Sequence, residues 1–344
     1  MRYVLLALLS WLAGCDESQT AGGQADLSGY LERLSAVTGI EIPPAAPGAY
    51  SLDMPRDQLS DLSGSGQIDL IDFLSLSGCE LQINLARRNT QMGRIASPSQ
   101  RLLLDLEFMA LTPNCALMLN ERGDSELADK LMEVSRERQA LAVHSIHQAI
   151  LMGPEWRQFW QPPRTLNRYP EATSTQIVTS LTRLVRLTDQ WMGGDWDASN
   201  REFELLLSDL RAGDGGALLL AYHRVAQDLD RANQMLTQSV AIAPLCPYGK
   251  PTERSRALER IVASFFVGDV QPWLVAIRQR KELLLEPIQA LETVLSEALN
   301  PHYVDWQSRR DALLEAQPEL IRTHVGHIQR TLADCETDLR TAPR

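Results

Sequence analysis

The sequence lacks the short motifs that mark the commonest catalytic and nucleotide-binding sites. It contains no Gly-x-Ser-x-Gly pattern, no Gly-x-x-x-x-Gly-Lys-Ser/Thr run and no Gly-x-Gly-x-x-Gly run. It also has no Cys-x-x-Cys pair, and no histidine follows a glutamate by three positions. These absences argue against a nucleophile-elbow hydrolase, a phosphate-loop or dinucleotide-binding enzyme, and common zinc or helical carboxylate metal sites. We therefore expect no catalytic residues, no cofactor and no bound metal.

Lysine is scarce, and acidic residues outnumber basic ones. Only three lysines, Lys130, Lys250 and Lys281, occur among 33 basic residues, and 44 acidic residues bring the formal net charge to −11. An acidic surface repels nucleic acid and anionic lipid headgroups alike. We therefore expect no nucleic-acid partner and no membrane attachment through a basic patch. The 344 residues are 44% apolar and 22% charged, which is the composition of an ordinary folded protein.

The first fifteen residues are typical of an export signal. A single arginine precedes an apolar run from Val4 to Leu12, which is too short to span a bilayer. The sequence Leu12-Ala13-Gly14-Cys15 resembles the lipobox of bacterial lipoproteins, in which the leader is removed and the cysteine is acylated. We expect a signal peptide at residues 1–14 and a lipidated tether at 15–24, with the lipid on Cys15. An uncleaved N-terminal helix is the alternative.

Acylation of Cys15 implies an address on the periplasmic side of the cell envelope. Several acyl chains hold a protein firmly to a membrane, because each buried methylene contributes about 0.8 kcal/mol. Asp16 and Glu17 follow the cysteine, and an acidic residue there resembles the inner-membrane retention signal of enteric bacteria. We therefore favour the inner over the outer membrane.

Four cysteines remain after Cys15, and an oxidising compartment favours their pairing into two disulfides. Four cysteines permit three connectivities. We favour Cys79 with Cys115 and Cys246 with Cys335, because each bond then closes a loop within one half of the chain. Four buried free thiols are the alternative.

The chain after the tether divides into an irregular stretch and a long helical part. Residues 39–66 are rich in proline, glycine and serine, with at most a brief helix around Arg56 to Leu62. No later segment alternates like a β-strand. We expect an all-α, multi-helix bundle of about ten helices over residues 25–341, with possible halves at 25–165 and 170–341.

Helical periodicity is clearest in four segments of the chain. Their apolar residues fall on one face at about 100° per residue, as in amphipathic helices. These segments are 125–152, 216–236, 270–299 and 318–339. Cys335 falls on the apolar face of the last segment, which directs its thiol towards the core.

The most unusual polar cluster lies between residues 84 and 101. It contains four arginines around a predicted turn between two helices, the second capped by Ser97 or Ser99. These arginines are Arg87, Arg88, Arg94 and Arg101. Together they can bind a carboxylate or phosphate through bidentate hydrogen bonds. Internal pairing with Asp and Glu is the alternative, which we favour.

Two other polar patterns imitate metal sites. His144 with His147, and His324 with His327, are spaced so that each pair on a helix can reach one metal ion, but a pair supplies only two ligands. We favour histidines on a surface or in a groove. The run 195–200 imitates a calcium loop but lacks its turn glycine and its bidentate glutamate, so a helix N-cap at Ser199 or Asp197 is the better interpretation.

An aromatic cluster follows Gly153-Pro154. Trp156, Phe159 and Trp160 are spaced to share one face of a helix. They form either an exposed ridge that binds a partner or the bilayer surface, or part of the core. We favour the core, because large aromatic side chains at this spacing are usually buried.

Five short segments carry a family resemblance. They are Cys79-Glu80-Leu81, Pro98-Ser99-Gln100-Arg101-Leu102, Gly153-Pro154-Glu155-Trp156 with Phe159-Trp160, Gly215-Gly216-Ala217-Leu218 and Val270-Gln271-Pro272-Trp273-Leu274. Together they resemble an uncharacterised family of gammaproteobacterial lipoproteins, defined only as a domain of unknown function. The resemblance spans nearly all of the chain after Cys15. It implies an envelope address and a helical architecture, and it identifies no catalytic residues.

We expect a lipid-anchored periplasmic helical protein that binds a protein partner, with a role in envelope maintenance and no catalysis. The alternative is a receptor or enzyme for a small anionic ligand at the arginine-rich turn 87–101. Such a ligand site requires Arg87, Arg94 or Arg101 to converge on unfilled space. A partner-binding protein instead requires an exposed apolar or aromatic patch.

Overall fold

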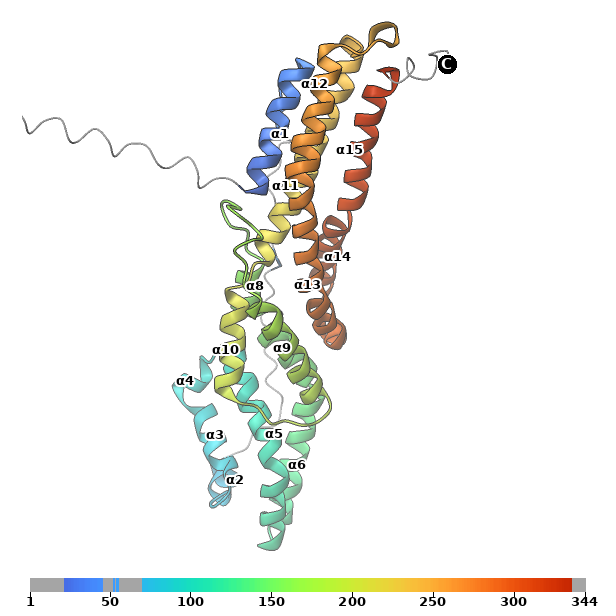
Figure 1. Cartoon of the computed structure of the whole chain (residues 1–344). Coiled ribbons are helices and arrows are strands. Elements are labelled where there is room, and N and C mark those ends of the chain that lie inside the picture. Colours follow the sequence, from blue (N-terminus) through green and yellow to red (C-terminus); the bar gives the residue numbers. More distant parts are fainter. Residues whose placement is uncertain (1–21, 46–51, 53, 56–69, 336–344) are drawn as a thin grey trace, which may run out of the picture.

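The computed structural model describes residues 22–45, 52, 54–55 and 70–335 (Figure 1). No strand occurs in these ranges, which confirms the all-α class. The helices are α1 (Gly23–Thr38), α2 (Leu70–Ser75), α3 (Leu81–Asn89), α4 (Gln91–Arg94), α5 (Pro98–Glu121), α6 (Ser125–Ala140), α7 (Ala142–Ile150), α8 (Pro154–Phe159), α9 (Gln176–Met192), α10 (Asn200–Arg211), α11 (Gly215–Ile242), α12 (Glu253–Ile261), α13 (Gln271–Val294), α14 (Pro301–Glu315) and α15 (Gln317–Leu332). Shorter 3₁₀ segments are η1 (Pro247–Gly249), η3 (Ser296–Ala298) and η4 (Ala333–Cys335), and η2 (Val262–Val270) is a π-helix. Cys15 and the brief helix expected around Arg56 to Leu62 lie outside the described residues.

The helices form an elongated molecule (Figure 1). At one end α1 packs against α11, α12 and η2, and α15 packs along α11. At the other end α5 packs against α3 and α6. Between these ends, α9 contacts α13 and α10, and α7 contacts α5 and α9.

Two hydrophobic clusters form the core. The smaller cluster joins α3, α5 and α6 and includes Phe108 and Leu131. The larger cluster contains the buried face of α7 and the buried apolar side chains of α8, α9, α10, α11 and α13. α5 contributes to both clusters, since Leu106 belongs to the larger and Leu119 to the smaller.

The single helix expected over 125–152 is two helices, and that prediction was wrong. α6 ends at Ala140 and α7 begins at Ala142, with Leu141 at φ −95° and ψ −1° between them. At about 100° per residue, the large apolar side chains of α7 lie roughly 125° around from those of α6. A straight helix would expose one of these faces. The break allows α6 to pack in the smaller cluster and α7 in the larger one.

Helix starts follow the capping residues in the sequence. The Ser97 hydroxyl accepts a hydrogen bond from the Gln100 amide at 3.3 Å at the start of α5. The Ser199 hydroxyl accepts one from the Glu202 amide at 3.3 Å at the start of α10. Each bond satisfies one of the free amides of a helix N-terminus. Ser97 and Ser199 are therefore the caps among the candidates that the sequence offered.

The cysteines pair as the sequence predicted. A disulfide joins Cys79, which lies just before α3, to Cys115 in α5, and the two residues are 36 positions apart. Cys246 and Cys335 are joined across 89 residues, so the chain after α11 is tied to the end of α15. The Cα atoms of the two pairs lie 5.7 and 5.1 Å apart.

Two helical stretches are long and apolar enough to cross a membrane by length and composition alone. They are Pro98–Glu121 and Glu253–Val294. Both pack within the body, the first against α3, α6 and α7 and the second against α1, α9 and α11. Packing in the core accounts for the apolar character of α5, half of whose apolar window is buried.

Candidate functional site

The arginine-rich turn pairs two of its guanidinium groups with carboxylates of the adjacent helix. Arg87 contacts Glu107, and Arg88 contacts Asp105, both on α5. Arg138 of α6 also reaches Asp105, at 3.4 Å. Asp105 is thus shared between two arginines from different helices. These contacts neutralise the positive charge that an anionic ligand would need.

The other two arginines do not complete an anion site in the described part of the chain. Arg101 is exposed on the first turn of α5, and the side chain of Arg94 lies outside the described residues. Neither of the two pockets described below is lined by an arginine from the turn 87–101. The structure therefore favours internal pairing, and we carry the anionic-receptor hypothesis no further.

The aromatic cluster of α8 belongs to the core. Trp156 and Phe159 are fully buried and stack with ring centroids 5.5 Å apart, and Trp160 is 3% exposed. Trp160 meets the ring of Trp306 from α14 edge-on at 5.3 Å. The interpretation as core is confirmed, and the exposed ridge is ruled out.

The histidine pairs were expected on a surface or in a groove, and this was wrong for two of the four residues. His147 is 4% exposed and His324 is fully buried, because helices distant in sequence cover them. No group of three or more His, Cys, Asp or Glu side chains among the described residues is placed to hold a metal ion. The buried histidines are therefore explained by core packing.

His324 lies in a buried chain of hydrogen bonds. Tyr30 of α1 donates its hydroxyl proton to His324 Nε2 at 2.9 Å. His324 Nδ1 lies 2.7 Å from Asn233 Oδ1, which only accepts, so the Nδ1 atom carries the proton of a neutral imidazole. Burial raises the pKa of Tyr30, which keeps its hydroxyl protonated as a donor. Burial, with a smaller contribution from His327, lowers the pKa of His324 to about 3.

This histidine predicts a loss of stability in acid. Its folded-state pKa of about 3 lies below the ordinary 6.5, so the unfolded chain binds more protons between these values and stability falls as the pH drops through that window. From about pH 7.5 to about pH 5.5, His324 alone should remove about 1.4 kcal/mol of unfolding free energy. Urea denaturation should show a loss about 1.4 kcal/mol larger in wild type than in His324→Gln, in which His223 and His327, whose pKa values burial also lowers, still contribute. The exposed His302 supplies a control, since His302→Gln should keep the wild-type loss. An equal pH dependence in wild type and His324→Gln would contradict the assignment.

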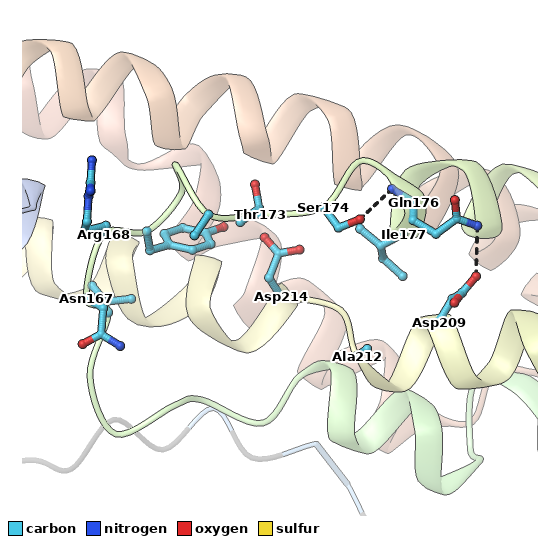
Figure 2. Close-up of a pocket in the computed structure, with 12 residues that line it drawn as sticks. Asn167, Arg168, Thr173, Ser174, Gln176, Ile177, Asp209, Ala212 and Asp214 are labelled. Atoms are coloured by element: carbon cyan, nitrogen blue, oxygen red, sulfur yellow. Dashed lines mark hydrogen bonds between the residues drawn. The ribbon is translucent and has the colours of Figure 1, made fainter.

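A pocket of about 460 Å³ opens beside the connection between α8 and α9 (Figure 2). We call it the loop pocket. One wall is formed by the segment 166–177, and the other by the end of α10 and the turn before α11. Figure 2 shows the side chain of Asp214 directed towards the first wall and that of Ile177 directed towards the second, with Asp209 on α10 facing Gln176.

Hydrogen bonds from α13 fix the wall formed by segment 166–177. The Trp273 indole Nε1 donates to the Tyr169 carbonyl oxygen at 2.9 Å. The Arg280 Nη2 donates to the Ser174 carbonyl oxygen at 3.0 Å. Within the wall, the Thr173 hydroxyl donates to the Pro170 carbonyl oxygen at 2.7 Å. The wall is therefore held at two points by one helix before α9 begins at Gln176.

The start of α1 is wedged against this same wall. A Cβ atom at Gly23 would lie 1.8 Å from the Trp273 ring, and one at Gly22 would lie 2.5 Å from the Asn167 carbonyl oxygen. Only glycine allows so close an approach. The described chain thus begins directly beside the loop pocket.

The polar groups of the loop pocket differ in their hydrogen-bond partners. Asp214 accepts two hydrogen bonds from the buried Arg280, at 2.9 and 2.5 Å. The Tyr169 side chain is 7% exposed, and its hydroxyl lies beside the Asp214 carboxylate without a hydrogen bond of good geometry. Burial, reinforced by Asp214, raises the pKa of Tyr169 well above its ordinary value, so the hydroxyl is neutral.

Asp209 is the carboxylate of the loop pocket without a cationic partner among the described residues. Its Oδ2 atom accepts hydrogen bonds from the Ser180 hydroxyl at 2.7 Å and from Gln176 Nε2 at 3.1 Å. No hydrogen bond from a described residue reaches its Oδ1 atom. The pocket therefore offers a negative oxygen with unused acceptor capacity.

A second pocket, of about 420 Å³, lies between the C-terminal ends of α1 and α11 and the start of α12. Three exposed apolar or aromatic side chains lie close in sequence there, Val240, Ile242 and Tyr248, and we call this surface the distal end. Ile242 is 75% exposed and Tyr248 is fully exposed. The Cys246–Cys335 disulfide adjoins the turn that carries Tyr248.

The fold and these pockets define an all-helical, disulfide-bonded domain with a polar pocket beside the connection between α8 and α9 and exposed apolar side chains near the end of α11. The chain belongs to the family described as a protein of unknown function (DUF3080), which matches residues 27–339. No curated protein and no solved structure matches the chain. The expected membership of an uncharacterised family is confirmed, and the lipoprotein character remains a proposal.

Proposed function

We propose that the protein is a lipid-anchored periplasmic protein that binds a protein partner and contributes to envelope maintenance. The observation that carries this proposal is the sequence Leu12-Ala13-Gly14-Cys15 after a short apolar run, which is the pattern of a lipoprotein leader. The family match covers residues 27–339, so this leader precedes the family domain. Acyl chains would hold the body at a membrane although its net charge of −11 repels anionic lipid.

The position of the first described residues supports the proposal that the loop pocket lies close to the membrane. Gly22 follows Cys15 by seven residues, and an extended chain of that length spans at most about 25 Å. Acylation of Cys15 would keep the wall near Asn167 within this reach of the bilayer. α11 has 28 residues and runs about 42 Å from the loop pocket to the distal end. The exposed side chains of the distal end support a role in partner binding.

Replacing Cys15 by serine is expected to abolish lipidation and processing. Wild-type protein should incorporate labelled palmitate and migrate as a chain shortened at its N-terminus, because acylation precedes removal of the leader. Cys15→Ser should carry no label and accumulate as the longer precursor. Ser18→Ala is the matched control, since it alters the same segment and keeps the sulfur. Unlabelled wild type, or Cys15→Ser with unaltered processing and fractionation, would contradict the proposal.

The address and the partner are tested in the intact envelope. Because Asp16 and Glu17 favour retention, wild-type protein should co-sediment with inner-membrane markers in a density gradient. Crosslinking in native envelopes, followed by mass spectrometry, should join the protein reproducibly to the same partner. Repeated failure to capture any partner would count against the binding role.

A further inference from the structure

We propose that the loop pocket binds a primary ammonium group, supplied by a lysine side chain in a basic segment of the protein partner. The inference rests on the proposed partner-binding function but does not depend on the lipid anchor. Its basis is a pocket that combines a carboxylate without a compensating cation and apolar lining residues.

The charges around the loop pocket leave one negative charge uncompensated among the described residues. Asp214 is neutralised by Arg280 at 2.5 Å. Arg168, which also lines the pocket, is paired with Glu171 at 2.6 Å. Asp209 lacks such a partner, and its hydrogen bonds come from neutral groups. A cation that enters the pocket therefore gains an attraction that an anion or a neutral ligand does not gain.

The hydrogen-bonding groups fit an ammonium donor. A lysine ammonium has three donors and no acceptor. The pocket offers an acceptor at Asp209 Oδ1, which receives no hydrogen bond from a described residue, whereas the Tyr169 hydroxyl lies beside the paired Asp214 and Arg280. A lysine ammonium that donates to Asp209 Oδ1 would form a charge-assisted hydrogen bond, which is stronger than one between neutral groups.

The apolar part of the lining suits the methylene stem of lysine. Leu166 and Ile177 are each 4% exposed and line the pocket, and Ala212 adds a small side chain at the end of α10. Figure 2 shows Ile177 beside the bonded pair of Gln176 and Asp209. A lysine side chain can bury its stem along such a surface while its charged end reaches a carboxylate. The acidic body, with a net charge of −11, attracts the basic segment that carries the lysine.

The test is calorimetric titration of the purified full chain with Nα-acetyl-lysine amide. At a low salt concentration of about 50 mM, wild type should bind this probe, and the neutral isostere Nα-acetyl-norleucine amide should not bind. Asp209→Asn should weaken binding about tenfold or more, because it removes a charge-assisted hydrogen bond. Glu204→Gln is the matched control, since it removes a carboxylate of the same helix outside the pocket and should leave the affinity within about twofold.

A second variant keeps the test decisive if Asp209→Asn folds poorly. Ala212→Phe fills the pocket and leaves both carboxylates in place, so it should abolish binding while thermal unfolding stays as in wild type. Equal binding of the norleucine probe, binding of a neutral hexose in place of the lysine probe, or no weakening in either variant would overturn the inference.

Further comparisons distinguish a polypeptide source of the amine from a free diamine. They also distinguish failure of this inference from failure of the proposed lipid anchor. Stronger binding of a lysine-containing peptide than of 1,4-diaminobutane supports a polypeptide partner, and the reverse order overturns the assignment to a partner segment. Amine binding by a chain that takes up no palmitate would contradict the lipid anchor and leave the amine site in place. Palmitate uptake by a chain that binds no amine would contradict the amine site and leave the lipid anchor in place.

Discussion

Replacing Arg310 by alanine is expected to lower the free energy of unfolding by about 3–5 kcal/mol. The Arg310 side chain is fully buried and donates to both carboxylate oxygens of Glu292, at 2.6 and 2.9 Å. Glu292 is itself 2% exposed, so the substitution leaves an uncompensated charge in the core. The guanidinium also lies 5.2 Å from the ring centroids of Trp160 and Trp306, so its removal opens a cavity between them. Urea denaturation of the purified chain measures the loss.

The neighbouring Arg309 provides the control for this prediction. Arg309 contacts Asp305 at 3.1 Å on the surface, where both side chains are more than half exposed. Arg309→Ala should therefore cost less than about 1 kcal/mol. If Arg310→Ala cost no more than Arg309→Ala, the buried pair would not be the constraint that the structure indicates.

Removing the Cys246–Cys335 disulfide is expected to cost up to about 4–5 kcal/mol in the chain-entropy model. The bond closes a separation of 89 residues, and breaking it returns conformational freedom to the unfolded chain. The double variant Cys246→Ala/Cys335→Ala should unfold at a lower urea concentration than wild type. The turn that carries Tyr248 should also become more accessible to protease, because its covalent tie to α15 is lost.

The second disulfide serves as the comparison. Cys79→Ala/Cys115→Ala opens a separation of only 36 residues and should cost somewhat less, up to about 4 kcal/mol. Peptide mapping under non-reducing conditions should recover the two pairs separately. A fragment that links Cys79 to Cys246 or Cys335 would contradict the connectivity on which both predictions depend.

The features that local rules determine were predictable from the sequence. Apolar periodicity predicted the helices observed as α11, α13 and α15, because burial of one face depends only on spacing along the helix. The predicted ends were less accurate, since α13 ends at Val294 and α15 at Leu332, and residues 336–339 lie outside the described part of the chain. The i, i+3, i+4 spacing of Trp156, Phe159 and Trp160 placed them in the core. The break at Leu141 was also readable, since the apolar positions change face there, but no glycine or proline marks it.

The features that depend on contacts between distant segments were not predictable. His324 is buried because Tyr30, 294 residues away, reaches its ring. The loop pocket combines a segment that we treated as a possible boundary between halves with Asp209 and Asp214 from the end of α10 and the turn after it. Its polar residues share no motif, so no sequence pattern announces the site. The pairing of Arg87 with Glu107 likewise depends on how α3 packs against α5.

The mass of the N-terminal peptide tests the central claim most directly. The first arginine or lysine after Cys15 is Arg33, so trypsin should release residues 15–33 from protein isolated from its native envelope. We predict that this peptide begins at Cys15 and carries the added mass of acyl chains on that residue. An unmodified cysteine at position 15, within a peptide that begins upstream of it, would contradict the account.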